Sequence, residues 1–223
     1  MKIAITGANG KVGQALIGQL DPAKFEITAL DLPEHDVSNL GHLIEATKGH
    51  DAILHFAWAE LKDNFLSGTI DPINTQMMAN AYLAAAANKI PRVIMASSNH
   101  AHRHDLRDTD GKIRASINPP IPDSPYGAEK VFMEALGRYH ATHDGLEVVC
   151  LRIGNVNAKD ARQADSPQDP TRWMSHADFG RLVTNCLTAD SVPDGFQIVY
   201  GVSEQPVFDW SNPFGYEPQD SAV

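Results

Sequence analysis

Tyr126 and Lys130 lie four residues apart in the segment YGAEK. On a helix this spacing places both side chains on one face, about one turn apart. A phenol has an ordinary pKa of about 10 and is a poor base at neutral pH, but a nearby ammonium group stabilises its phenolate form. The pair could therefore transfer protons near neutral pH. Because the same spacing also arises by chance on helices, the interpretation depends on other segments.

A glycine-rich segment near the N-terminus could hold a phosphate-bearing ligand. The sequence TGANGKVG, residues 6–13, lies between a strand-like run and a helical pattern. Its glycines permit a tight turn, close backbone approach to a pyrophosphate and close packing of helix on strand. In this strand–turn–helix context, the pattern predicts a dinucleotide site. The loop residues expected to contact the dinucleotide are Gly7, Asn9, Gly10, Lys11, Val12 and Gly13.

Asp31 ends the second predicted strand. A carboxylate at this place accepts hydrogen bonds from the adenosine ribose and repels a 2'-phosphate. The next four residues, LPEH, include no arginine or lysine that could bind such a phosphate. We therefore expect NAD in preference to NADP. The alternative interpretation is an ordinary aspartate in the turn after a strand.

Short apolar runs alternate with helical patterns along the chain, as in a parallel sheet with crossover helices. Strands are predicted over residues 2–6, 25–30, 51–56, 92–96, 146–153 and 196–200. Helices are predicted over residues 11–20, 40–47, 72–88, 125–143 and 176–188. Two helix starts are recognisable: Ser124-Pro125 offers a cap followed by proline, and SHAD at 175–178 fits a capping box. The expected fold is α/β, a doubly wound parallel sheet of the Rossmann type.

Two long irregular stretches, 99–123 and 155–174, follow predicted strands at their carboxyl ends. Open α/β sheets bind ligands at this edge, and loops of such length are commonly functional. With the tail 201–223 they form a minimal substrate-capping region of one domain, residues 1–223. The histidines of HAHRH at 100–104 suggest a metal site, but neighbouring arginines and the lack of a paired motif lead us to expect none.

The composition suits one globular domain, with 43% hydrophobic and 21% charged residues among 223. A formal charge of -10 argues against nucleic-acid partners and anionic membrane surfaces. Cys150 and Cys186 lie in apolar stretches, as buried thiols do in a reducing compartment. The chain begins with a strand-like run instead of a signal peptide, and no apolar run approaches the length of a membrane span. We expect a cytoplasmic protein.

Ser98 follows the fourth predicted strand, where a hydroxyl group could bond a substrate oxygen. Together, TGxxGxxG near the N-terminus, this serine and YxxxK on the next long helix resemble the fingerprint of the extended short-chain dehydrogenases/reductases. The resemblance covers essentially the whole chain. It implies that Ser98 positions the substrate oxygen and that Tyr126 is the general acid/base. It also implies that Lys130 holds the nicotinamide ribose and tunes Tyr126.

The same resemblance assigns roles outside this trio. Asn74 matches the structural asparagine that the family has near its active site. Asp36 and Val37 resemble the pair that contacts adenine, although Asp36 could equally be an aspartate that starts a Ser-Asn turn. Phe56 and Ala57, where the third strand ends, complete the predicted cofactor contacts.

Longer segments resemble uronate dehydrogenases and their sugar-dehydrogenase relatives. The matching segments are SSNH (97–100), YGAEKVF (126–132), LRIG (151–154) and WMSHADF (173–179). Uronate dehydrogenases use NAD to oxidise the anomeric carbon of a hexuronic acid to a lactone. The resemblance therefore implies NAD as cofactor and a small sugar or sugar acid as substrate. It implies substrate contacts from Ser98, Asn99 and His100.

An arginine grips the substrate carboxylate in those enzymes, and two arginines compete for this role here. Arg162 and Arg172 both lie in a loop that is longer than in the family, and a bidentate arginine suits a carboxylate. Glu60 would repel an anionic sugar unless it points away. An epimerase, a dehydratase, a carbonyl reductase and a non-catalytic dinucleotide sensor remain alternatives. The family also implies a homodimer through the helices 72–88 and 125–143.

Overall fold

The computed structural model of the chain describes residues 1–59, 69–116, 119–162 and 169–221. Its strands are β1 (Lys2–Thr6), β2 (Glu26–Leu30), β3 (Ala52–His55), β4 (Arg92–Ser98), β5 (Glu147–Ile153) and β6 (Phe196–Gly201). They form one sheet in the order β2-β1-β3-β4-β5-β6, and all neighbouring pairs are parallel. The predicted doubly wound α/β fold is confirmed. That the chain is a single domain stays a prediction.

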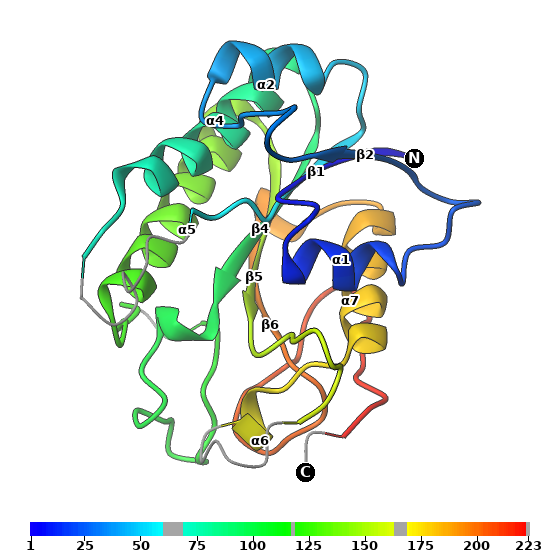
Figure 1. Ribbon diagram of the computed structural model, residues 1–223. Helices are drawn as coiled ribbons and strands as arrows, with labels where there is room; N and C mark the ends of the chain where they lie inside the picture. The colour runs from blue at the N-terminus through cyan, green and yellow to red at the C-terminus, as the bar shows by residue number, and fades with distance from the viewer. Residues whose placement is uncertain (60–68, 117–118, 163–168, 222–223) are drawn as a thin grey trace.

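Helices cover both faces of this sheet (Figure 1). The helices are α1 (Lys11–Ile17), α2 (Leu40–Ala46), α4 (Pro72–Asn88), α5 (Pro125–Asp144), α6 (Asp169–Arg172) and α7 (His176–Thr188). α1 packs with α7 on one face, and α4 packs with α2 and α5 on the other. Adjacent strand residues therefore enter opposite cores: Ile53 packs toward α4, and Leu54 toward α7.

Both recognisable helix starts are present. The Ser124 hydroxyl oxygen accepts a hydrogen bond from Gly127 N (3.1 Å), and Pro125 is the first residue of α5. The Ser175 hydroxyl oxygen accepts from Asp178 N (2.9 Å) at the start of α7. The Asp178 side chain, however, does not complete a capping box among the described contacts. It instead accepts hydrogen bonds from the backbone amides of Gln219 and Asp220 in the tail.

β4 is longer than predicted, because Ser97 and Ser98 belong to the strand. They pair with Arg152 and Ile153 of β5. The prediction ended the strand at residue 96 because two serines are typical of a turn. Their polar groups have partners within the fold, however: Ser97 Oγ donates to Glu134 Oε1 at 2.6 Å. α1 ends earlier than predicted, at Ile17, where a glycine follows it.

The segments that follow β4, β5 and β6 pack against one another at the carboxyl edge of the sheet. Ile113 N donates to Val207 O (2.8 Å), and Asp209 N donates to Ile113 O (2.9 Å). Ser203 N donates to Trp173 O (3.1 Å). These contacts join the tail to both long loops. The described residues also form the 3₁₀ helices η1 (Asn99–Ala101) and η2 (Pro193–Gly195).

No helix among the described residues is long and apolar enough to cross a membrane. No group of three or more His, Cys, Asp or Glu side chains in this part of the chain could hold a metal ion.

Candidate active site

The glycine loop between β1 and α1 is packed tightly against the chain that leaves β3. Gly7 has a φ of 67°, and a Cβ there would lie 2.5 Å from Ala57 N. A Cβ on Gly13 would lie 2.5 Å from Gly7 O. Gly10 caps α1 without a side-chain hydrogen bond, because glycine has no side chain that could bond the amides of the first turn. Such a loop lets a pyrophosphate approach bare backbone, and these residues fit NAD.

Asp31, after β2, is tied to this loop. Its Oδ2 accepts a hydrogen bond from Asn9 N (2.7 Å), and its Oδ1 accepts one from Leu32 N (2.8 Å). Asn9 and Lys11 are exposed, and Val12 is half-buried. The carboxylate therefore stands beside the loop, as the prediction of a ribose contact requires.

Asp36 and Val37 are held where the chain enters the second crossover. Asp36 is exposed, and hydrogen bonds from the hydroxyl and the amide of Ser38 lower its pKa. Val37 is buried, and its carbonyl accepts from Asn80 Nδ2 (3.0 Å). These hydrogen bonds form the local turn that Asp36 was expected to start if it did not contact adenine. The adenine contact stays a prediction.

Tyr126 and Lys130 face the end of β4 from the first turns of α5. Lys130 Nζ donates to Ala96 O (2.7 Å) and lies 5.4 Å from the centre of the Tyr126 ring. Trp58 completes the group, with its ring 3.8 Å from Lys130 Nζ and edge-on to the Tyr126 ring at 5.1 Å between centres. The four-residue spacing in YGAEK therefore places the side chains of Tyr126 and Lys130 against the same ring, that of Trp58.

Lys130 is almost completely buried, and burial lowers its pKa to about 7. Glu129 and Glu134 raise this pKa but do not overcome the loss of hydration. Burial likewise raises the pKa of the Glu129 carboxyl group, against the effect of Lys130. The amine can therefore gain or lose its charge near neutral pH.

Asn74 fixes the chain that carries Trp58. Its Oδ1 accepts from Ala59 N (2.7 Å), and its Nδ2 donates to Ala59 O (3.2 Å). Phe56, in contrast, points into the core against Phe179, with 6.0 Å between ring centres. The backbone of Phe56 borders Gly7 of the glycine loop, and the cofactor contact of Phe56 stays a prediction.

His100 lies beside Tyr126, and Ser98 contacts His100. His100 N donates to the Ser98 hydroxyl oxygen (3.2 Å), and the rings of His100 and Tyr126 meet edge-on with centres 5.8 Å apart. His100 Nδ1 lies 2.8 Å from Asp123 Oδ2. The end of β4 therefore places a hydroxyl group, an imidazole and a phenol together.

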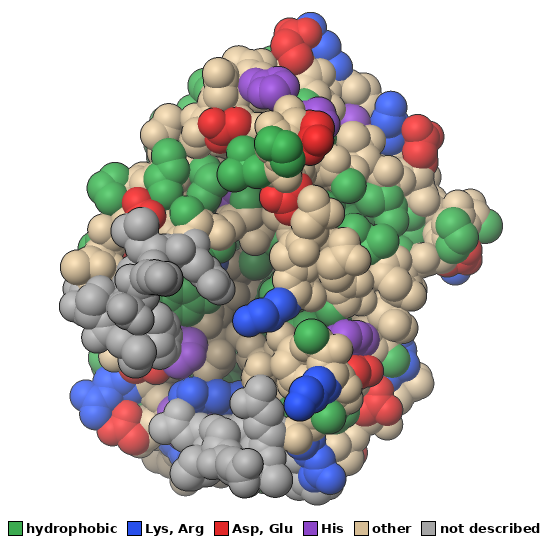
Figure 2. Space-filling model, in the orientation of Figure 1, with side chains coloured by type: hydrophobic (Ala, Val, Ile, Leu, Met, Phe, Trp, Pro, Cys, Tyr) green, Lys and Arg blue, Asp and Glu red, His purple; other side chains and the backbone are tan. Residues whose placement is uncertain are grey.

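Asn99 links this group to Arg172. In the amide orientation that satisfies its neighbours, Nδ2 donates to Ile153 O (3.1 Å) and Oδ1 accepts from Arg172 Nε (3.0 Å). Arg162 lies exposed on the loop after β5, and Glu60 lies outside the described residues. Arg172 borders a hollow of about 480 Å³, lined also by Arg103, His104, Asp105, Pro122 and Asp123. The space-filling view shows this face of the molecule (Figure 2).

A buried ion pair holds α5 against the sheet, one turn after Lys130. Arg152 donates to both carboxylate oxygens of Glu134 at 2.8 Å, and Ser97 donates to the same carboxylate. Arg152 also donates to the Tyr200 hydroxyl (3.3 Å). Because each buried charge has several partners, the network can hold the register of α5 against β4 and β5.

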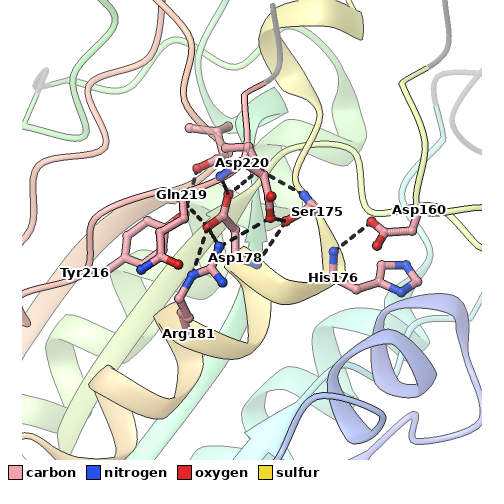
Figure 3. A network of polar contacts seen from close by, with 10 residues as sticks. Asp160, Ser175, His176, Asp178, Arg181, Tyr216, Gln219 and Asp220 are labelled. Carbon is pink, nitrogen blue, oxygen red and sulfur yellow. Dashed lines mark hydrogen bonds and ion pairs between the residues drawn. The ribbon is translucent and has the colours of Figure 1, made fainter.

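A second network fastens the tail to the start of α7 (Figure 3). Asp178 is fully buried and accepts from Ser203 Oγ (2.6 Å) and Gln219 N (2.9 Å). The first residue of α7, His176, contacts the loop after β5, because its backbone N donates to Asp160 Oδ1 (2.8 Å). The tail, α7 and the loop after β5 are therefore connected.

Trp58 and Asp123 belong to the site, but no sequence motif assigns them to it. From the sequence, Trp58 is equally compatible with packing and with the substrate pocket, and Asp123 belongs to no motif. The signal for Asp123 is its position directly before the cap Ser124-Pro125.

The parallel sheet with helices on both faces, and the glycine loop between β1 and α1, are those of a Rossmann-like α/β protein. The family model "NAD dependent epimerase/dehydratase family" matches residues 3–181. The chain belongs to this family, so the predicted family is confirmed and the protein is an NAD-dependent enzyme.

Relatives span nearly the whole chain. L-arabinose 1-dehydrogenase (NAD(P)(+)) of Haloferax volcanii is 31% identical over 251 residues, covering 100% of this chain and 98% of its own. Uronate dehydrogenase of Pseudomonas syringae pv. tomato is 28% identical, covering 99% and 82%. The crystal structure of uronate dehydrogenase from Agrobacterium tumefaciens superposes with a TM-score of 0.79 at 25% identity, covering 99% and 85%.

Proposed function

We propose that this enzyme is an NAD-dependent dehydrogenase that oxidises the C1 hydroxyl of a small sugar or hexuronic acid to a lactone. The observation that carries the proposal is the convergence of Ser98, Tyr126 and Lys130 at the end of β4. Support also comes from relatives that match nearly the whole of this chain and whose names are those of sugar and uronate dehydrogenases.

Each side chain has a role that its position allows. Tyr126 takes the proton of the C1 hydroxyl group, and Ser98 donates a hydrogen bond to the same oxygen. Lys130 shares a face with Tyr126, and in its charged form it favours the phenolate. Asn74 acts indirectly, by fixing the chain around Trp58. NAD, when bound, supplies the hydride acceptor.

The cofactor is proposed to lie along the glycine loop. The amides that follow Gly7 and Gly10 would hold the pyrophosphate, and Asp31 the adenosine ribose. Ala57, whose backbone packs against Gly7, would border the nicotinamide half. Lys130 would hold the nicotinamide ribose.

For the substrate, we propose contacts from Asn99, His100 and Arg172. Arg172 is preferred to Arg162 because it reaches the Asn99 side chain and borders the hollow beside Asp123. A guanidinium group there suits the carboxylate of a uronic acid.

A homodimer through α4 and α5 is part of the proposal. These helices pack side by side and expose three large apolar side chains: Leu83 (42%), Phe132 (44%) and Tyr139 (51%). Covering this surface would remove it from water. Sedimentation velocity tests the proposal, and a monomer at all concentrations would oppose it.

The decisive experiment follows NADH formation with a panel of glucuronate, galacturonate, L-arabinose, glucose and glucose 6-phosphate. Wild type is compared with Tyr126→Phe, which keeps the ring against Trp58 and His100. We expect the variant to lose about 10²- to 10⁴-fold in kcat, the contribution typical of general acid–base catalysis. Equal turnover by both proteins would refute the mechanism. Tightly retained NAD without net NADH formation would instead indicate an epimerase.

A further inference from the structure

Asp123 contacts two parts of the proposed site, although no role has been assigned to it above. Its Oδ2 lies 2.8 Å from His100 Nδ1, and its backbone nitrogen donates to His100 O at 3.2 Å. Its Oδ1 accepts from Ser124 Oγ at 2.8 Å. One residue therefore clamps His100 at two points and also touches the cap of the helix that carries Tyr126.

His100 has little freedom to leave this clamp. Its backbone nitrogen donates to Ser98 Oγ, and its ring meets the Tyr126 ring at an interplanar angle of 73°. A Cβ on Gly127 would lie 2.1 Å from His100 O, so α5 packs directly on this carbonyl. The side chains of His100 and Asp123 are only 21% and 25% exposed. The imidazole is thus held through the His100 backbone, through Nδ1 and by the Tyr126 ring.

A carboxylate at Nδ1 determines where a neutral imidazole carries its proton. An ionised carboxylate can only accept hydrogen bonds, so Nδ1 must be the protonated nitrogen. Burial raises the pKa of Asp123, but His100, Ser124 and Arg172 hold it below its ordinary value. With the proton on Nδ1, Nε2 of the neutral ring can only accept.

We propose that Asp123 is a positioning residue, which fixes the Nδ1-protonated tautomer of His100 so that this ring accepts a hydrogen bond from a sugar hydroxyl beside Tyr126. The substrate part rests on the proposed sugar oxidation, whereas the tautomer does not. An acceptor here discriminates between substrate groups, because a hydroxyl group can donate to it and a carboxylate cannot. Asp123 and His100 together therefore favour binding of a sugar hydroxyl group at this place, whereas a substrate carboxylate would bind Arg172.

The tautomer can be measured without any substrate. Long-range ¹⁵N–¹H spectra of the histidine rings at about pH 9, where histidines are ordinarily neutral, are recorded for wild type, Asp123→Ala and Ser124→Ala. The spectrum of His100→Ala assigns the signal among the ten histidines. We expect an Nδ1-protonated ring in wild type and in Ser124→Ala, and a shift toward the Nε2-protonated form in Asp123→Ala. An Nε2-protonated ring in wild type would overturn the proposal.

Kinetics then test whether Asp123 acts through His100. With the sugar that wild type oxidises fastest, Asp123→Ala should lower kcat/KM about 10- to 100-fold, as loss of an orienting partner does at other sites. In the His100→Ala background the same change should cost no more than about twofold. Ser124→Ala removes the cap and one hydrogen bond to Asp123 Oδ1 but leaves the contact of Asp123 Oδ2 with His100. It should lower Tm but keep kcat/KM within about twofold of wild type.

Retained NADH binding by Asp123→Ala shows that the variant folds. Equal losses from Asp123→Ala with and without His100 would overturn the proposal, since a merely structural role would give that result. If wild type oxidises no sugar, the proposed function fails, while the ring spectra still decide the tautomer.

Discussion

Replacing Lys130 with methionine should change stability in a pH-dependent way. Burial lowers the folded-state pKa of this amine from 10.5 to about 7. Between these values the unfolded chain binds a proton that the folded protein lacks, so the free energy of unfolding of wild type rises with pH. Below about pH 7 the folded protein must bury the charged amine, so wild type is destabilised by the full effect. The destabilisation decreases as the pH rises toward 10.5. Methionine has no titratable group and removes this dependence.

The pKa shift sets the magnitude. Each pKa unit corresponds to about 1.4 kcal/mol, so the full effect is about 5 kcal/mol, of which about 2–3 kcal/mol falls between about pH 6.5 and 9. In Lys130→Met the hydrogen bond to Ala96 O is lost and this carbonyl group is left unpaired. The loss lowers the free energy of unfolding of the variant by about 2 kcal/mol and so offsets part of the gain. Lys130→Met should therefore be about 2–3 kcal/mol more stable than wild type at about pH 6.5, and about equally stable at about pH 9.

Urea unfolding of both proteins without NAD, followed by circular dichroism, measures this difference at each pH. Lys24→Met, at an exposed position, is the matched control and should change little across the range. The reasoning is wrong if the difference between Lys130→Met and wild type is the same at both ends of the range. The same variant should lose dehydrogenase activity, because a group that is costly to bury is retained for its chemistry.

Three further substitutions test the cofactor loop, the packing of α5 and the substrate contact. Asp31→Ser should lower the preference for NAD over NADP about 10- to 100-fold in kcat/KM by removing a repelling charge; an unchanged ratio would contradict the ribose assignment. Gly127→Ala should lower the free energy of unfolding by about 2–4 kcal/mol in urea, because its Cβ would lie 2.1 Å from His100 O. Gly41→Ala, in ordinary contact, is the control and should be neutral or stabilising. Arg172→Met should raise KM for uronates about 10- to 100-fold and leave neutral sugars nearly unchanged; equal effects on both would remove Arg172 from carboxylate binding.

Much of the fold was predictable because its signals are local. Alternating apolar runs and helical patterns located the strands and the longer helices to within a few residues, whereas the short α6 lies in a stretch that was expected to be irregular. At Ser97-Ser98 the strand is longer than predicted because its backbone pairs with β5 and the Ser97 hydroxyl bonds Glu134, and both partners lie far along the chain. The caps at Ser124 and Ser175 were also legible, since a capping serine bonds an amide only three residues away.

The candidate site divides in the same way. The glycine loop and the Tyr126–Lys130 pair were recognisable because their spacing along the chain matches their spacing in a turn or on a helix face. The clamp of Asp123 on His100 was not, because it closes a loop of 23 residues. The choice between Arg162 and Arg172 likewise required the contact of Arg172 with Asn99.

The sequence by itself determined the class of fold, the family and the chemical types of the groups at the site, since these depend on short-range patterns. Tertiary structure decided their environment. It buried Lys130 under Trp58, which lowers the pKa of the amine to about 7, and it set His100 between Asp123 and Tyr126. The physical reason is that hydration and hydrogen-bond partners depend on residues brought together from distant parts of the chain, and no local spacing specifies them.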